Sequence, residues 1–288
     1  MTILVTGANG QLGRETVLAL QADGVPLIAV GRDELDFSRP GQVAEAIADY
    51  AADWVINCAA YTQVDRAEEQ REVAFTINRD AARAVAEGVK LSGGHLLHVS
   101  TDFIFGGEKS SPYKEDDVPN PLGVYGRSKL EGEQAVREVL PEALILRTAW
   151  VYGSHGHNFV KTILRLAAER EELRVVDDQI GTPSWTGDIV KAMQALIKDK
   201  ATGTYQFTNE GVASWYDFAM GIVAGAKQAG YPVIAETIHP IPTEDFPLPA
   251  SRPAYSVMSK VKIRGVLGYP IPHWRDSLCA MLNQKSNA

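Results

Sequence analysis

Tyr125 and Lys129 stand four positions apart in the stretch GVYGRSKLEGE, a spacing that could let them exchange a proton with a substrate. Residues i and i+4 lie on one face of a helix, so the phenol and the ammonium would be neighbours. A free phenol has a pKa of about 10, too high for efficient proton exchange near neutral pH. A nearby cation favours the phenolate, so we expect Lys129 to lower the pKa of Tyr125. Alone the spacing is weak evidence, because most such pairs are surface side chains.

Two hydroxyl side chains, Ser100 and Thr101, end the apolar run HLLHVST upstream of this pair. If a strand stops near Ser100, both hydroxyls lie at the C-terminal edge of a sheet, where ligands of open α/β sheets bind. Thr101 would hold a substrate oxygen beside the phenol. The predicted catalytic group is therefore Thr101, Tyr125 and Lys129, and Thr101 also contacts substrate.

Three glycines, Gly7, Gly10 and Gly13, follow the first apolar run in ILVTGANGQLGRE. Their G-x-x-G-x-x-G spacing differs by one residue from the commoner dinucleotide fingerprint. A strand before and a helix after them supply a tight turn, a close approach of backbone to pyrophosphate, and anion binding at a helix N-terminus. This context predicts a dinucleotide-binding loop.

The end of the second apolar run carries Gly31, Arg32 and Asp33. An acidic residue at this place usually holds the ribose hydroxyls of NAD, whereas an arginine accommodates a 2′-phosphate. Arg32 therefore favours NADPH. Asp33 leaves NADH use open, and a solvated arginine in a turn is the alternative interpretation of Arg32.

Alternating strands and helices must position these residues. Short apolar runs predict strands at 3–7, 26–31, 54–60, 95–101 and 143–153, and helical patterns lie at 11–22, 40–51, 78–92 and 125–139. Strands that are apolar on both faces and separated by helices imply a parallel sheet covered on both sides. The predicted fold is α/β, a Rossmann-type doubly wound parallel sheet.

The regular alternation loosens after about residue 150. Further helices are predicted at 158–172, 186–199 and 214–229. Prolines at 240, 242, 247, 249 and 253 disfavour helix interiors and central strands, so we expect 240–254 to be an extended segment over a surface or cleft.

The bulk composition limits the partners. The 288 residues carry a formal net charge of −8, which argues against nucleic acid or an anionic membrane as the main partner. Two cysteines give no disulfide framework, and neither a signal peptide nor an apolar run of about 20 residues is evident. We expect a cytoplasmic protein.

With these motifs in place, the chain resembles the extended short-chain dehydrogenases/reductases, and within them the dTDP-4-dehydrorhamnose reductase family. The segments that carry the resemblance are TGANGQLG (6–13), DFSRP (36–40), NCAAYTQVDRAE (57–68), STDFIFGG (100–107), VYGRSKLEGE (124–133), LRTAWVYG (146–153), NFVKTILRLAAEREELRVVDDQIGTP (158–183), SWYDFA (214–219) and ASRPAYS (250–256). Of these, AAYTQVDRAE, RTAWVYG and VVDDQIGTP separate this branch from the wider superfamily.

The resemblance implies two domains. Residues 1–149, with parts of about 174–210 returning, would form the NAD(P)-binding Rossmann domain, and about 150–173 and 211–288 a smaller α/β domain for a nucleotide sugar. The implied cofactor-binding residues are Gly7, Gly10, Gln11, Leu12, Arg32, Asp36, Phe37, Ser38, Ala59, Ala60, Thr62, Tyr125 and Lys129.

The implied reaction is reduction of the C4 keto group of dTDP-4-dehydro-6-deoxy-L-mannose to give dTDP-L-rhamnose, with Tyr125 supplying a proton to the developing alkoxide. Trp150 matches the family's sugar-stacking tryptophan, although a tryptophan at a domain seam is the alternative. Asn158, Lys161 and Arg252 are candidates for the dTDP pyrophosphate, and Arg252 suits it best because a guanidinium binds phosphate oxygens in a bidentate way. The family often has tyrosine at the position of Phe103.

Two other kinds of protein compete with this hypothesis. One is a different extended-family enzyme, a nucleotide-sugar epimerase or 4,6-dehydratase, although a dehydratase would carry an acid where Phe103 stands. The other is a non-catalytic NADP-binding regulatory subunit like that of methionine adenosyltransferase. No histidine has metal-ligand spacing, so no metal site is predicted. Some relatives use magnesium at a dimer interface, and its use here stays open because the sequence does not identify the carboxylate ligands. Sequence leaves the choice between monomer and homodimer open.

Overall fold

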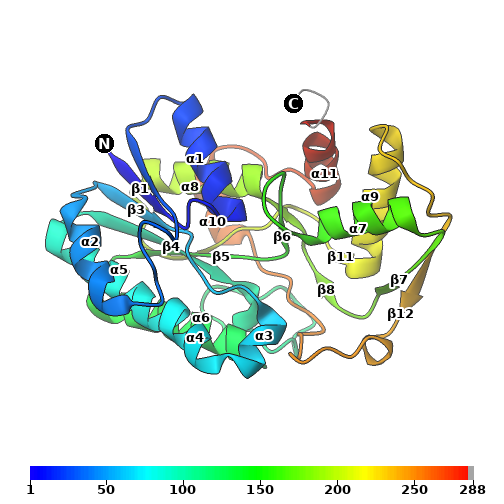
Figure 1. Ribbon diagram of the computed structural model, residues 1–288, viewed down its shortest axis with the longest axis horizontal. Helices are drawn as coiled ribbons and strands as arrows, with labels where there is room; N and C mark the ends of the chain where they lie inside the picture. The colour runs from blue at the N-terminus through cyan, green and yellow to red at the C-terminus, as the bar shows by residue number, and fades with distance from the viewer. Residues whose placement is uncertain (285–288) are drawn as a thin grey trace.

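The computed structural model describes residues 1–284 and is built around a six-stranded parallel sheet (Figure 1). The strand order is β10-β5-β4-β3-β1-β2, with adjacent strands parallel throughout. The bounds are β1 Ile3–Thr6, β2 Leu27–Val30, β3 Trp54–Asn57, β4 His95–Thr101, β5 Leu144–Thr148 and β10 Gly203–Gln206. The doubly wound fold is confirmed, and β10 is a strand that the sequence did not reveal.

Helices cover both faces of this sheet (Figure 1). One face packs under α1 Gln11–Ala22, α8 Thr186–Lys198 and α10 Val261–Leu267, and the other under α2 Val43–Asp49, α5 Ala81–Ser92 and α6 Val124–Val139. Each face has its own apolar core, of which Leu97 and Leu96 in β4 are neighbouring members pointing opposite ways. Ile263 and Leu267 of α10 belong to the first of these cores, although the expected boundaries placed them in the second domain.

A third core lies beside the sheet in the later part of the chain. Its elements are β6 Val151–Tyr152, α7 Phe159–Glu169, β7 Glu172–Val176, β8 Ile180–Gly181, β9 Ser184–Trp185, β11 Ala213–Ser214, α9 Trp215–Gln228, β12 Thr237–Ile241 and α11 Trp274–Asn283. Here β6 pairs with β9, β8 with β11 and β7 with β12. These small sheets and helices lie at the right in Figure 1.

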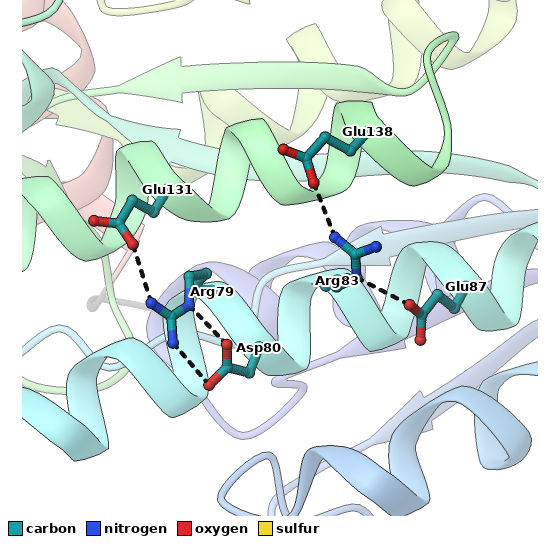
Figure 2. A network of polar contacts seen from close by, with 6 residues as sticks. All are labelled: Arg79, Asp80, Arg83, Glu87, Glu131 and Glu138. Carbon is teal, nitrogen blue, oxygen red and sulfur yellow. Dashed lines mark hydrogen bonds and ion pairs between the residues drawn. The ribbon is translucent and has the colours of Figure 1, made fainter.

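The chain between β3 and α5 forms α3 Val64–Glu69, α4 Arg71–Phe75 and a π-helical segment Thr76–Asp80 that runs into α5. Helix α6 lies beside α5 and the π-helical segment, and Figure 2 shows the ion pairs that join them: Arg79 of the π-helical segment with Glu131, and Arg83 of α5 with Glu138. Exposed pairs of this kind each contribute little, about 0–1 kcal/mol. The close approach of Gly132 to the Asn78 carbonyl oxygen shows that backbone packing, rather than charge, sets the distance.

Some predicted elements differ in detail. The expected strand 143–153 is divided into β5 and β6, because Trp150 adopts a left-handed backbone with φ +47° that no strand accommodates. The proline-rich segment begins as the end of β12, makes a short 3₁₀ turn at Thr243–Asp245, and runs irregularly to residue 254. Within residues 1–284, no helix is long and apolar enough to cross a membrane.

Candidate active site

The glycine loop joins β1 to α1 in the form that the spacing predicted. Gly7 has φ +66°, and a Cβ there would lie 2.7 Å from the Ala59 backbone nitrogen. A Cβ at Gly13 would lie 2.2 Å from the Gly7 oxygen, so only glycine lets α1 begin this close to the loop. Gly10 caps α1 without any side-chain bond to the helix N–H groups. Those N–H groups are therefore available to an anion such as a pyrophosphate.

A cavity of about 450 Å³ opens at the carboxyl ends of β1, β2 and β3. Nine of the predicted cofactor residues line it: Gly7, Gly10, Arg32, Asp36, Phe37, Ser38, Ala59, Ala60 and Thr62. A cavity of this size at this edge of a parallel sheet suits a dinucleotide. The residues present thus fit the group that the loop implied.

Arg32 lies at the outer end of this cavity with its side chain 80% exposed. Its nearest acid is Asp36, 3.9 Å away, a distance too long for a tight pair. The Ser38 backbone and hydroxyl lower the pKa of Asp36, with smaller contributions from Arg32 and Arg39. Arg32 is therefore a free guanidinium beside a cavity wall, in a position to meet a phosphate.

Gln11 and Leu12 are placed differently from the other predicted cofactor residues. The Gln11 amide donates to the Val151 carbonyl, and Leu12 is buried in the core beneath α1. Neither side chain lines the cavity. Any contribution of these two residues to cofactor binding comes from their backbone N–H groups at the start of α1.

Thr101, Tyr125 and Lys129 meet at the carboxyl end of β4. Thr101 is the last residue of β4, and Tyr125 and Lys129 occupy successive turns of α6; all three are buried. The Thr101 hydroxyl donates to Asp102 at 3.1 Å and forms a side-chain hydrogen bond with Tyr125. The Lys129 ammonium donates to the Val99 carbonyl at 2.7 Å. The structure thus brings the predicted catalytic group together.

The predicted decrease in the pKa of Tyr125 is not found. Burial and, to a smaller degree, the Asp102 carboxyl raise the pKa of the phenol to about 12, against the hydrogen bond with Thr101, which lowers it. Burial also lowers the pKa of Lys129 to about 8, against the opposing charge of Glu133. The Lys129 ammonium donates to the Val99 carbonyl, and its charge is not among the causes of the shift in the pKa of Tyr125. A neutral phenol is nevertheless the form that a proton donor requires.

Asp102 follows Thr101 and is an acid that sequence reasoning left without a role. It is buried, and burial raises the pKa of its carboxyl to about 6 although Ser256 and Thr101 bond to it. By accepting the Thr101 proton it leaves the Thr101 oxygen free to accept from Tyr125. Asp102 therefore orients the hydroxyl that faces the phenol.

Trp150 stacks on Trp215 with ring centroids 3.5 Å apart and planes 4° apart. A Cβ on Gly181 would lie 2.5 Å from the same indole, so the neighbouring strand also contacts it. One face of Trp150 is therefore occupied by Trp215. The alternative interpretation, a tryptophan at a seam between domains, describes these contacts, and sugar stacking by Trp150 stays a prediction.

Asn158 caps α7 rather than presenting a free amide. Its oxygen accepts from the Lys161 backbone at 3.1 Å, and its nitrogen donates to Gln11 and to the Gly153 carbonyl. Both N–H donors are thus engaged, and a phosphate needs donors. The structure gives this residue a capping role that the sequence did not suggest. Lys161 likewise donates to the Gly156 carbonyl.

Arg252 is held by an acid from the first half of the chain. Its guanidinium makes a bidentate pair with Asp65 of α3, at 2.8 and 3.1 Å, and donates to the Ala250 carbonyl. The Asp65 carboxylate also accepts from the Ala250 backbone N–H. The pair fastens the proline-rich segment to the Rossmann half of the molecule.

Helix α3, which the sequence did not reveal as a helix, connects several parts of this site. Arg66 lines the cavity, Asp65 holds Arg252, and Glu68 accepts the backbone N–H of Val124 at the start of α6 at 2.8 Å. The acidic run VDRAEE was the sequence feature that could have indicated this role, because acidic side chains near the N-terminus of a neighbouring helix accept hydrogen bonds from its free N–H groups. Among residues 1–284, no group of three or more His, Cys, Asp or Glu side chains could hold a metal ion.

A Rossmann sheet with a dinucleotide-sized cavity, next to a buried tyrosine and lysine on successive turns of one helix, defines the extended short-chain dehydrogenases/reductases. The chain matches the family described as RmlD substrate binding domain over residues 1–287. It is 42% identical over 286 residues to dTDP-4-dehydrorhamnose reductase of Burkholderia thailandensis, covering 96% of each chain. The chain belongs to the dTDP-4-dehydrorhamnose reductase family.

Solved structures agree with this assignment. A dTDP-4-dehydrorhamnose reductase from Clostridium acetobutylicum superposes with a TM-score of 0.94 at 38% identity, covering 99% of this chain and all of that one. The enzyme of the same name from Bacillus anthracis, solved in complex with NADP, gives 0.92 at 37% identity, with 98% and 99% covered.

Proposed function

We propose that this protein reduces the C4 keto group of dTDP-4-dehydro-6-deoxy-L-mannose to give dTDP-L-rhamnose, with NADPH as the reductant. The observation that carries the proposal is the buried Tyr125 phenol hydrogen-bonded to Thr101 at the carboxyl edge of the sheet. Family membership over nearly the whole chain supports the substrate class.

The side chains divide the chemistry between them. A reduced nicotinamide, when bound, would supply the hydride to the sugar C4 carbon. With substrate present, the Thr101 hydroxyl would turn from Asp102 to donate to the carbonyl oxygen and hold it close to the Tyr125 hydroxyl. As the carbonyl becomes an alkoxide, the Tyr125 proton passes to it. An alkoxide is far more basic than a phenolate, so a phenol with a raised pKa still transfers its proton readily and is fully protonated beforehand. Stabilising the developing oxyanion by preorganised donors is the larger part of such catalysis.

The preference for NADPH over NADH rests on Arg32. Its exposed guanidinium lies beside the cavity where the second strand ends, and it is not tightly paired. A 2′-phosphate would find a bidentate donor there. The NADP-bound relative from Bacillus anthracis is consistent with this preference.

The sugar nucleotide would lie between the two halves of the molecule. In this arrangement residues 1–149 with about 174–210 bind the cofactor, and about 150–173 with 211–288 bind the sugar nucleotide, except that α10 packs with the first part. Arg252 would contact the pyrophosphate and Trp150 the sugar. The protein would act in the cytoplasm as a monomer or homodimer.

The test is NADPH oxidation by the purified chain given the 4-keto sugar nucleotide. We expect turnover, and we expect Tyr125→Phe to lower kcat by several orders of magnitude with NADPH binding nearly unchanged. Tyr205→Phe, a tyrosine of the edge strand β10, is the control and should retain activity. An epimerase would interconvert sugar nucleotides without net NADPH use. Intact NADPH binding without turnover would support a regulatory subunit instead.

A further inference from the structure

Glu133 and Arg147 form a buried ion pair behind the catalytic group. The guanidinium binds both carboxylate oxygens, at 2.9 and 2.7 Å, with side chains only 1% and 3% exposed. Arg147 also donates to the Glu115 carbonyl, and Arg137, on the surface side, is 3.5 Å from the same carboxylate. Burying two charges is expensive, and apolar residues of the same volume often give equal or greater stability. We therefore expect the Glu133–Arg147 pair to have a function other than stabilising the fold.

The position of Glu133 suggests that role. Tyr125, Lys129 and Glu133 are separated by four residues each, so they follow one another along one face of α6. Arg147 lies in β5 opposite Ser100 of β4, in the part of the sheet that this face covers. The ion pair thus stands one helical turn behind the lysine, on the side away from the phenol.

Resting on the proposed reductase function, we propose that Glu133, fixed by Arg147, is a positioning residue that keeps the Lys129 ammonium charged and in place beside the catalytic tyrosine. Lys129 itself reaches only a neutral partner in its one described hydrogen bond, the Val99 carbonyl. A buried ammonium bound to a neutral acceptor is prone to lose its proton. An ionised carboxylate one turn away opposes that loss.

The other titratable groups near Lys129 do not supply this charge. They are Tyr125 on α6, Cys58 after β3, His98 on β4 and Arg147 on β5. Burial raises the pKa of Cys58 and of Tyr125 to about 12 each, so both are neutral at physiological pH. Burial lowers the pKa of His98 well below its ordinary value, so it is neutral as well.

Glu133 is therefore the carboxylate, among residues 1–284, that opposes the burial lowering the pKa of Lys129 to about 8. Arg147 is needed because a buried carboxylate requires a counter-charge. The sign for activity follows from the predicted cofactor-binding role of Lys129, which needs the ammonium: Lys129 is charged below its pKa and neutral above it. Loss of the Glu133 charge should move the alkaline limit of activity toward lower pH.

The experiment is the pH dependence of kcat for NADPH oxidation with the 4-keto sugar nucleotide, from pH 6 to pH 10, in wild type and Glu133→Gln. We expect the alkaline limb of the variant to move down by about one pH unit or more, which at pH 8 is about a fivefold loss or more for a group that titrates near 8. KM for the sugar nucleotide should change less than twofold. Glu133→Asp, which keeps the charge, should restore most of the wild-type limb, and Glu131→Gln on the exposed side of α6 should leave it unchanged.

Glu133→Gln leaves Arg147 buried without a counter-charge and so risks a loss of folded protein. The double variant Glu133→Gln, Arg147→Gln removes both charges and should show an acid shift in the same direction, smaller than that of Glu133→Gln because the Arg147 cation is lost as well. NADPH binding, followed by its fluorescence over the same pH range, gives a readout that does not need turnover and should weaken at a lower pH in these variants. If folded variants lose thermal stability but keep the wild-type alkaline limb and the wild-type binding curve, the pair is only structural and the inference fails. Absence of turnover in wild type would count against the proposed function instead.

Discussion

Gly132→Ala is predicted to destabilise the protein and disturb catalysis through a single methyl group. A Cβ at this position of α6 would lie 2.0 Å from the Asn78 carbonyl oxygen. Carbon–oxygen contacts are normally about 3.3 Å or longer, so α6 and the π-helical segment must separate by more than 1 Å. The obstacle is backbone, which cannot rotate out of the way as a side chain tip can.

Two effects oppose one another in this substitution. Replacing glycine by alanine inside a helix favours folding by about 1 kcal/mol. Forcing an extra methyl into a tight contact costs about 1–3 kcal/mol, and a clash with a backbone oxygen belongs at the upper end. We therefore expect a net loss of about 1–2 kcal/mol, which lowers the thermal midpoint by about 2–8 °C in a chain of this size.

Gly265→Ala is the matched control, since Gly265 is also inside a helix, α10, and a Cβ there meets nothing within 4 Å. This variant should gain only the higher helix propensity of alanine, and its thermal midpoint should lie about 2–4 °C above that of wild type. Calorimetry measures both midpoints, and NADPH oxidation measures activity. Because α6 carries Tyr125 and Lys129, a shift near 1 Å should lower kcat/KM by about 100-fold in Gly132→Ala. Equal midpoints for the two variants, or full activity of Gly132→Ala, would refute the reasoning.

Two further substitutions test cofactor and substrate recognition. Arg32→Ala should raise KM for NADPH by about 10-fold to 100-fold, because a charge-assisted contact with the 2′-phosphate is lost, and should leave KM for NADH nearly unchanged. An equal effect on both cofactors would mean that Arg32 is only a solvated side chain in a turn. Asp65→Asn should raise KM for the sugar nucleotide about tenfold with little change in kcat, because Arg252 loses the partner that orients it, whereas a fall in kcat alone would contradict this. Arg252 lowers the pKa of Asp65 below its ordinary value of 3.8, so the ion pair stabilises the wild-type fold above that pH. This stabilisation is lost as acid protonates Asp65. Acid unfolding of wild type and of Asp65→Asn would show the difference.

The order of elements and the proximity of Tyr125 and Lys129 were predictable because each depends on local sequence. The apolar runs form the predicted strands, and Tyr125 and Lys129 lie four residues apart in one helix as expected. The pKa of Tyr125 could not be predicted from the sequence, because the burial that raises it is a property of the packed molecule. The direction in which the Lys129 ammonium points is equally invisible until β4 lies beside α6.

The features that the sequence did not reveal share a cause. Asn158 fits a phosphate site by type, and its position at the cap of α7 depends on partners brought by folding, Gln11 and Gly153. The edge strand β10 reads GTYQ and so lacks the apolar run that marks a central strand. The left-handed backbone of Trp150, which divides one predicted strand in two, leaves no trace in residue type.

The late position in the chain of β10 and of α8 and α10, which pack on the first sheet, has a consequence for the synthesis of the chain. The core between the sheet and α1 includes Ile3 and Val5 at one end and Ile263 and Leu267 at the other. Domains generally fold as they emerge during translation at about 5–20 residues per second. Here the first strands wait tens of seconds for residues beyond 260, with one apolar face of the sheet covered by α1 alone. A nascent chain that stops near residue 150 holds every predicted catalytic residue but lacks α8 and α10, which complete the cover of that face, so it should depend on chaperones and be prone to aggregate.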